Sequence, residues 1–364
     1  MMNRIRTASG RALIARLQIR PSLIKLDPCL FPGGPQPGEI IEVTGNTNCG
    51  KSSLSLRLIV TVLLPHTWRG MNIGGCDGGV IFLDSDLHFS ILQLENMMQR
   101  RIRRFLKLSK DAIKSKKNGY EFDEELIDDD HKIKELLHSD KASLKTEIDN
   151  LIKQCLKSFF YLKCTVSSQF AITLLSMNEL IMNKTKVSLI VIDSISAYYW
   201  HDKTYRAESW YKLEQYYNGI FKVFLSHVKN HKLVLLSTRQ SLFRKDYQKH
   251  RYVPCMEEEE SEVGMIEYEY LGKHWASFVT CRIHLSKLTT VPEDDITKND
   301  MISDNLLSNS SNSVTVGNNA NKCEGSVTPD DYRQMFSAEV IKNEKKTKLV
   351  FTIHEDGLRW RPQS

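Results

Sequence analysis

Short apolar runs recur at four places along the chain and predict the strands of a buried sheet. They occupy residues 39–44, 79–84, 187–193 and 232–237. Segments with helical periodicity separate them, such as residues 52–64 before Pro65. Near-continuous apolar strands between helices are typical of a parallel sheet that is covered on both faces. The pattern therefore predicts an α/β fold, with a mostly parallel twisted sheet and helices on both faces.

A short helix is expected before the first strand, in an N-terminal segment of residues 1–38. Ser9 would cap it, Pro21 would end it, and Leu13, Ile14 and Leu17 would form its apolar face. This helix either covers the protein's own core or docks onto a partner. Residues 39–364 are expected to form one domain, because an apolar run returns at residues 349–353.

Two segments differ in composition from the predicted core. Residues 107–150 are dense in Lys, Asp and Glu, which indicates a charged insertion that is helical or disordered. Residues 294–330 are rich in Asn, Ser and Asp and poor in large apolar side chains. That composition predicts a disordered loop inside the domain.

Composition narrows the function classes only slightly. No apolar run approaches the roughly 20 residues of a membrane helix, and residues 1–20 do not resemble a signal peptide. The eight cysteines contain no CxxC pair, which favours reduced intracellular thiols over a zinc site or a disulfide framework. The formal charge of +6 permits contact with nucleic acid without requiring it.

A phosphate-binding loop is predicted directly after the first strand, where the chain matches the pattern G-x4-G-K-S. In such a loop the glycines let backbone N–H groups turn toward phosphates at the start of the next helix. Lys51 would contact the β- and γ-phosphates of ATP, and Ser52 would give its hydroxyl to Mg²⁺. A glycine loop with an incidental lysine is the alternative, but the strand–loop–helix context favours the nucleotide. The eight positions are Gly45, Asn46, Thr47, Asn48, Cys49, Gly50, Lys51 and Ser52.

Three further polar positions follow predicted strands. Asp193 ends an apolar strand and would hold Mg²⁺ through water, unless it only terminates the strand. The segment Asp84-Ser85-Asp86 either orients an attacking water or caps a helix. Gln240 either senses the γ-phosphate or is an ordinary loop residue.

The order of these motifs resembles the ATPase core of RecA-type recombinases. The pattern comprises the phosphate-binding loop, Asp84-Ser-Asp86, Asp193-Ser194 and Thr238-Arg-Gln240. Further segments resemble the paralogues of these recombinases, namely residues 9–17, 28–31, 194–200, 271–275, 282–287 and 351–357. The resemblance covers most of residues 9–106, 151–290 and 336–360.

The resemblance implies a RecA-like P-loop ATPase core and a nuclear role in homologous-recombination repair of DNA double-strand breaks. Such paralogues form hetero-oligomers with other RecA-type paralogues and assist assembly of the strand-exchange filament on single-stranded DNA. Residues 1–38 are too few for the helical N-terminal domain of the recombinase itself, so we do not expect a complete recombinase.

One departure from the recombinase pattern concerns turnover. The recombinase carries a glutamate where this chain has Asp86. A carboxylate one methylene shorter would hold water farther from the γ-phosphate, and a misplacement of about 1 Å can cost roughly 100-fold in rate. We therefore expect ATP binding with slow or absent hydrolysis.

Contact with DNA is expected in one of two segments. Residues 199–206 interleave aromatic and basic side chains, as single-strand binding favours, and Lys203, Tyr205 and Arg206 are the candidates. An ordinary loop with inward-packed aromatics is the alternative. Residues 241–270 begin basic but continue with four adjacent glutamates, which would repel phosphates. Residues 99–107 predict a basic helix whose face is solvated or binds DNA or an import factor.

Three functions compete at this point. The first is an ATP-binding subunit of a paralogue complex, which Asp86 and the acidic loop favour. The second is an autonomous ATPase that depends on single-stranded DNA and pairs strands. The third is another P-loop enzyme such as a small-molecule kinase, for which no arginine-rich lid is evident.

Overall fold

The computed structural model describes most of the chain outside two long stretches. The described residues are 10, 14, 19–117, 128–138, 140–205, 210–241, 243–245, 265–267, 271–288, 335–354 and 357–361. The predicted N-terminal helix lies almost entirely outside them, as do residues 294–330 and the four adjacent glutamates.

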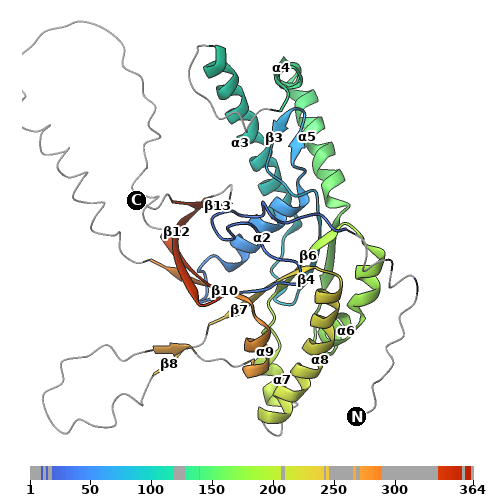
Figure 1. The fold of residues 1–364 in the computed structure, drawn as a ribbon, viewed down its shortest axis with the longest axis vertical. Helices are drawn as coiled ribbons and strands as arrows, with labels where there is room; N and C mark the ends of the chain where they lie inside the picture. Colours follow the sequence, from blue (N-terminus) through green and yellow to red (C-terminus); the bar gives the residue numbers. More distant parts are fainter. Residues whose placement is uncertain are drawn as a thin grey trace, which may run out of the picture.

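A large mixed sheet organises the described chain (Figure 1), with strand order β13-β12-β11-β10-β1-β7-β6-β4-β5. Six strands are parallel to one another: β1 (Ile40–Gly45), β4 (Gly79–Asp84), β5 (Phe159–Lys163), β6 (Val187–Asp193), β7 (Val234–Gln240) and β10 (Cys281–Lys287). Three antiparallel strands extend it: β11 (Met335–Lys342), β12 (Lys345–His354) and β13 (Gly357–Trp360). The predicted mostly parallel sheet is confirmed.

Eight helices connect or flank these strands in the described ranges. They are α2 (Lys51–Leu63), α3 (Ile91–Lys117), α4 (Asp130–His138), α5 (Lys141–Leu156), α6 (Ser167–Asn183), α7 (Tyr199–Tyr205), α8 (Trp210–Asn230) and α9 (Lys273–Phe278). Two small ladders join β2 (Thr67–Trp68) to β3 (Met71–Asn72) and β8 (Phe243–Lys245) to β9 (Met265–Glu267). None of the helices in these ranges is long and apolar enough to cross a membrane.

The sheet separates two hydrophobic clusters because successive side chains of a strand point to opposite faces. On β4, Val80 and Phe82 pack with the face that carries α2, α3 and α5. Ile81 and Leu83 pack with the opposite face, which carries α6, α8 and α9. Helices therefore cover both faces, as the apolar runs predict.

The charged stretch 107–150 is helical where it is described, so the helical alternative holds there. Ile113 on α3, Ile133 on α4 and Ile152 on α5 are buried in the same cluster as Phe82. Charged residues such as Lys110, Lys134 and Lys145 are exposed on the outer faces of these helices. The described part of the stretch thus extends the core at one end of the molecule (Figure 1).

A buried ion-pair network fixes the centre of the sheet. Glu42 on β1 is fully buried and accepts hydrogen bonds from Arg239 Nε on β7 at 2.9 Å and Arg282 Nε on β10 at 2.8 Å. Trp275 Nε1 on α9 donates to the same carboxylate at 2.7 Å. Since these bonds satisfy a carboxylate that burial would otherwise penalise, they lock three neighbouring strands in register.

Candidate functional site

The candidate site lies where parallel strands end side by side. In the strand register, Gly45 at the end of β1 lies beside Gln240 of β7, and Asp84 of β4 lies beside Asp193 of β6. Carboxyl ends of parallel strands are where α/β folds place ligands. An open cleft of about 450 Å³ lies at this edge. It is lined by Thr47, Asn48, Lys51, Ser52, Asp86, His88, Asp193, Ser194, Ser196, Ala197, Trp200 and Gln240.

The loop between β1 and α2 requires glycine at its two ends. Gly45 has a φ of +149°, and a Cβ there would lie 2.4 Å from Leu285 O. Gly50 has a φ of +94°, and a Cβ there would lie 2.9 Å from Ile353 Cδ1. The helix α2 then begins at Lys51, so its free N–H groups and positive dipole end point into the loop. The backbone is thus arranged to cradle an oxyanion.

Lys51, Ser52 and Asp193 meet at the mouth of this loop. Lys51 Nζ lies 2.8 Å from Gly45 O and 2.7 Å from Asn46 O. Ser52 Oγ lies 3.1 Å from Asp193 Oδ2, while the hydroxyl of Thr238 donates to Asp193 Oδ1. A hydroxyl and a carboxylate at this spacing are oxygen ligands of the kind that Mg²⁺ takes. The donor set therefore fits a phosphate-bound magnesium ion.

The two aspartates after β4 have different environments. Asp84 is buried and accepts hydrogen bonds from Leu87 N at 2.7 Å and from Tyr161 Oη at 2.9 Å, so it shapes the turn. Asp86 lines the cleft, and its Oδ1 accepts a hydrogen bond from Ser194 Oγ at 3.3 Å. Asp84 therefore holds the turn that leads to α3, whereas the carboxylate of Asp86 faces the cleft.

The pKa of Asp86 is raised above its ordinary value. Partial burial of its carboxyl group is the largest cause, and the negative charge of Asp193 across the cleft is the next. The hydrogen bond from Ser194 opposes both. The proton of Asp86 is thus held more firmly in the folded protein than in the unfolded chain.

Backbone hydrogen bonds tie the strand ends together. Ser85 N donates to Asp193 O at 2.9 Å, and Ile195 N donates to Thr238 O at 3.0 Å. Ser241 N donates to Gly45 O at 3.1 Å. The ends of β4, β6, β7 and β1 are therefore linked in series, which fixes the separation of the side chains that line the cleft.

The remaining sequence predictions fall at or beside this cleft. Gln240 is exposed and lines it. Residues 199–205 form the helix α7 instead of a loop; Tyr199 is buried and Trp200 is 51% exposed, so the aromatics divide between the core and the surface. Lys203 Nζ lies 4.9 Å from the ring centroid of Trp200, and Tyr205 is exposed. Arg206 lies outside the described residues.

Four residues that line the cleft were not predicted as site residues from the sequence: His88, Ser194, Ser196 and Trp200. His88 carries no sequence signal, because its approach depends on the turn that Asp84 holds. Ser194, Ser196 and Trp200 lie within residues 194–200, which resemble the recombinase paralogues. This resemblance is the sequence signal that points to them. The described residues contain no group of three His, Cys, Asp or Glu side chains that suits a metal ion.

Known proteins with similar sequences are DNA repair proteins. The mouse DNA repair protein XRCC2 is 27% identical over 315 residues, which cover 84% of this chain and 92% of the mouse protein. The Arabidopsis thaliana XRCC2 homolog is 23% identical over 69% of each chain. The Cricetulus griseus DNA repair protein RAD51 homolog 3 is 22% identical over 68% of this chain and 57% of its own.

The chain is therefore similar in sequence to XRCC2 proteins and to RAD51 paralogues. No protein-family model matches it. The similarity to the mouse protein extends over most of both chains, so it agrees with the resemblance that the phosphate-binding loop and the later motifs carry.

Replacing Asp86 by asparagine should stabilise the free chain at neutral pH. The unfolded aspartate has a pKa of about 3.9, and folding raises it. The folded state therefore favours the protonated form, and ionisation costs stability as pH rises through the folded pKa. Asp86→Asn removes this cost.

Thermal melts in EDTA across a range of pH measure the effect. The gain in Tm from Asp86→Asn should shrink as pH falls and vanish below about pH 4. Asp77→Asn, which removes a carboxylate from an exposed position, serves as the control. A lower Tm for Asp86→Asn at neutral pH would contradict the placement of Asp86 beside Asp193.

Proposed function

We propose that the chain is the ATP-binding subunit of a complex of RecA-type recombinase paralogues. In this proposal it acts in the nucleus, in homologous-recombination repair of DNA double-strand breaks, by assisting filament assembly on single-stranded DNA. The observation that supports it most is the single cleft that gathers Lys51, Ser52, Asp86, Asp193 and Gln240. The names of the similar proteins supply the repair context.

The proposed nucleotide site uses the loop Gly45 to Ser52 within a RecA-like core. The N–H groups at the start of α2 would bind phosphate oxygens, and Lys51 would neutralise their charge. Ser52 and, through water, Asp193 would hold the Mg²⁺, which when bound neutralises charge on the phosphates. Thr238 orients the carboxylate of Asp193 for this task. Gln240, at the end of β7, would contact the terminal phosphate.

Slow hydrolysis follows from the position of Asp86. A catalytic base must reach a water molecule lined up with the γ-phosphate, within hydrogen-bond distance. The hydroxyl of Ser194 donates a hydrogen bond to the short side chain of Asp86 and keeps it close to Asp193. A longer carboxylate at this position would extend farther into the cleft. The arrangement therefore supports nucleotide binding more strongly than turnover.

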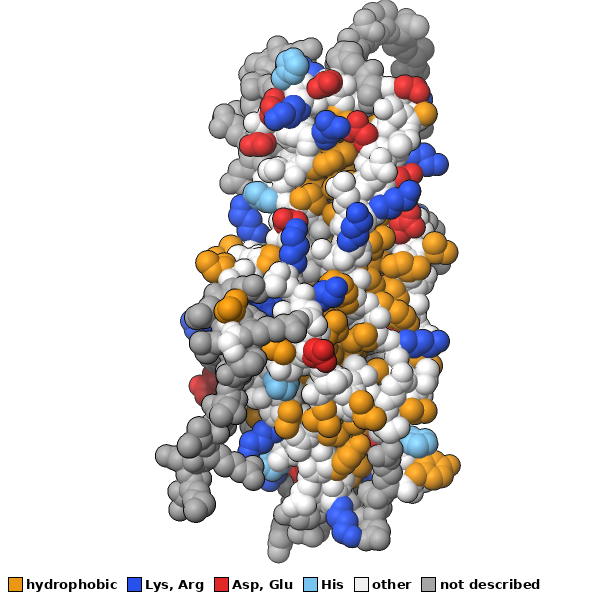
Figure 2. Space-filling view, turned by 90° about the vertical axis from the view of Figure 1, so that its right-hand side faces the viewer, with side chains coloured by type: hydrophobic (Ala, Val, Ile, Leu, Met, Phe, Trp, Pro, Cys, Tyr) orange, Lys and Arg blue, Asp and Glu red, His pale blue; other side chains and the backbone are white. Residues whose placement is uncertain are grey.

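Association with another paralogue is supported by an exposed apolar surface beside the edge strand β5. Val166, just before α6, is 52% exposed. Ile172 and Leu175, on α6, are 66% and 44% exposed. Viewed from the side on which α6 lies, the molecule shows apolar side chains running down this face (Figure 2). Exposed apolar patches of this kind mark protein–protein contacts.

Direct contact with single-stranded DNA is the less supported part of the proposal. Trp200 and Tyr205 are exposed on α7, and Lys203 stacks on Trp200 at the rim of the nucleotide cleft. Such a mixture of aromatic and basic groups suits a single strand. An autonomous DNA-dependent ATPase would use the same residues, so turnover distinguishes the two functions.

The proposed function predicts negligible ATP turnover by the purified chain, with or without single-stranded DNA. Asp86→Glu should raise the rate, by as much as about 100-fold, because it restores the reach of the carboxylate. Asp86→Gln is the matched control: it has the same length but cannot accept a proton, and should show no gain. Phosphate release measures all three proteins.

Wild-type turnover that rises strongly with single-stranded DNA would instead establish the autonomous ATPase. In that case Asp86 already reaches the water and Asp86→Glu would bring no gain.

Ile172→Asp should weaken association with a RecA-type paralogue partner. The change places a charge on the exposed apolar surface of α6, where a partner would have to desolvate it. Leu92→Asp is the control, because Leu92 is equally exposed, at 66%, but lies on α3, on the opposite face of the sheet. Sedimentation velocity of the mixed proteins measures the complex. Equal association by both variants would exclude this face of α6 as the contact.

A further inference from the structure

A second cavity, of about 250 Å³, lies away from the phosphate-binding loop, between α2, α3 and β13. Four arginines line it: Arg57 on α2, Arg101 and Arg104 on α3, and Arg359 on β13. We call it the arginine pocket. Its remaining walls are mostly apolar, including Met97 and Phe105. No carboxylate lines it among the described residues.

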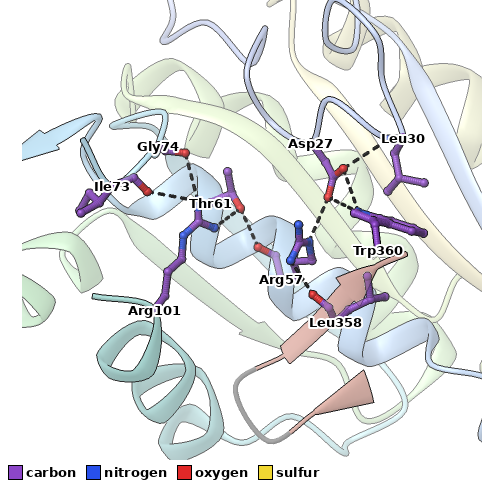
Figure 3. A network of polar contacts seen from close by, with 9 residues as sticks. All are labelled: Asp27, Leu30, Arg57, Thr61, Ile73, Gly74, Arg101, Leu358 and Trp360. Carbon is purple, nitrogen blue, oxygen red and sulfur yellow. Dashed lines mark hydrogen bonds and ion pairs between the residues drawn. The ribbon is translucent and has the colours of Figure 1, made fainter. Parts of the chain in front are cut away.

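One of the four arginines is already neutralised by the fold. Arg57 Nε lies 3.0 Å from Asp27 Oδ2, and the same carboxylate accepts from Trp360 Nε1 at 3.1 Å (Figure 3). Arg57 Nη1 also donates to Leu358 O at 2.6 Å. Arg57 therefore holds β13 against α2, and its charge is balanced by the buried Asp27.

Arg101 is held differently, by neutral groups only. Its guanidinium donates to Thr61 Oγ1 at 2.5 Å and to the carbonyl oxygens of Gly74 at 3.1 Å and Ile73 at 3.3 Å (Figure 3). No carboxylate in the described chain lies within ion-pair distance of it. Burial, and then the charge of Arg57, lowers the pKa of Arg101 to about 10, so it stays positive at neutral pH. The pocket thus keeps a largely buried positive charge that no carboxylate of the described residues pairs with directly.

Arg104 lies one turn after Arg101 on the same helix and is exposed at the rim. The guanidinium of Arg101 lies 5.9 Å from the ring centroid of Phe105, which places an apolar wall beside the charges. Guanidinium groups bind carboxylates and phosphoryl groups with paired hydrogen bonds. The pocket is thus built for an anion that has an apolar neighbour.

We propose that the arginine pocket binds an acidic peptide segment of a partner protein, in which a carboxylate or phosphoryl side chain is flanked by an apolar residue. The anion would bind Arg101 and Arg104, and the apolar residue would pack on Met97 and Phe105. Arginine clusters are a recurrent means of recognising acidic motifs.

A peptide fits this pocket better than a nucleic acid for two reasons. The volume is below the range of about 300–1,000 Å³ for sites of whole small molecules, so the pocket admits side-chain-sized groups. The apolar walls have no counterpart in a phosphate backbone, whose contacts are to phosphate and sugar. The proposal does not depend on nucleotide binding, because the pocket shares no lining residue with the phosphate cleft.

Fluorescence anisotropy with three labelled peptides tests the proposal on the full chain. The peptides share a Gly-Ser carrier and a central leucine, followed by glutamate, phosphoserine or glutamine. Binding of the glutamate or the phosphoserine peptide should be about tenfold tighter than binding of the glutamine peptide, since each charged hydrogen bond contributes about that factor. The two acidic arms distinguish a carboxylate from a phosphoryl ligand.

Arg104→Gln should weaken binding of whichever acidic peptide binds more tightly, by about tenfold. Arg103→Gln is the matched control, because it removes the same charge from the next position of α3 but does not line the pocket. Both residues are exposed, so both variants should melt like the wild type.

Equal weakening by Arg103→Gln and Arg104→Gln would overturn the pocket as the binding site, as would equal affinity for all three peptides or no binding of any. The same measurement with labelled oligothymidylate tests a single-stranded nucleic acid as the alternative occupant. Binding of oligothymidylate that is lost in Arg104→Gln, without peptide binding, would overturn the peptide as the occupant.

Discussion

Parallel pairing of β1, β7, β6 and β4 is the constraint on which the rest of this structure depends. The pairing aligns the last residues of four strands, so that Gly45 lies beside Gln240 and Asp84 beside Asp193. The buried carboxylate of Glu42 holds three strands in register from within the sheet. Because a slip of one residue would turn every side chain to the other face, this register places the cleft residues together.

The helix α2 connects the cleft at the strand ends to the arginine pocket. It begins at the phosphate-binding loop, and farther along it carries Arg57 and Thr61, which hold β13 and Arg101. The strand β12 packs against the loop, because its Ile353 Cδ1 would lie 2.9 Å from a Cβ at Gly50. The C-terminal strands therefore support the loop and form one wall of the arginine pocket.

Local features were predictable from the sequence, and features that depend on distant packing were not. The strands and the loop that ends at Ser52 can be recognised from short stretches of the sequence. The division of roles between Asp84 and Asp86 depends on Tyr161, which is remote in sequence. The core role of α4 and α5 was obscured because charged residues outnumber the buried Ile133 and Ile152. The arginine pocket joins α3 to a strand from the end of the chain, which no local pattern shows.

Measuring ATP binding is the most direct test that the cleft at the strand ends holds a nucleotide. Calorimetric titration of ATP with Mg²⁺ into the purified chain should show a single site. Binding should weaken when EDTA replaces Mg²⁺, and Lys51→Ala should abolish it, because the charge on the phosphates is then unbalanced. Binding of unchanged affinity in Lys51→Ala, or no binding by the wild-type chain, would contradict the assignment of this cleft.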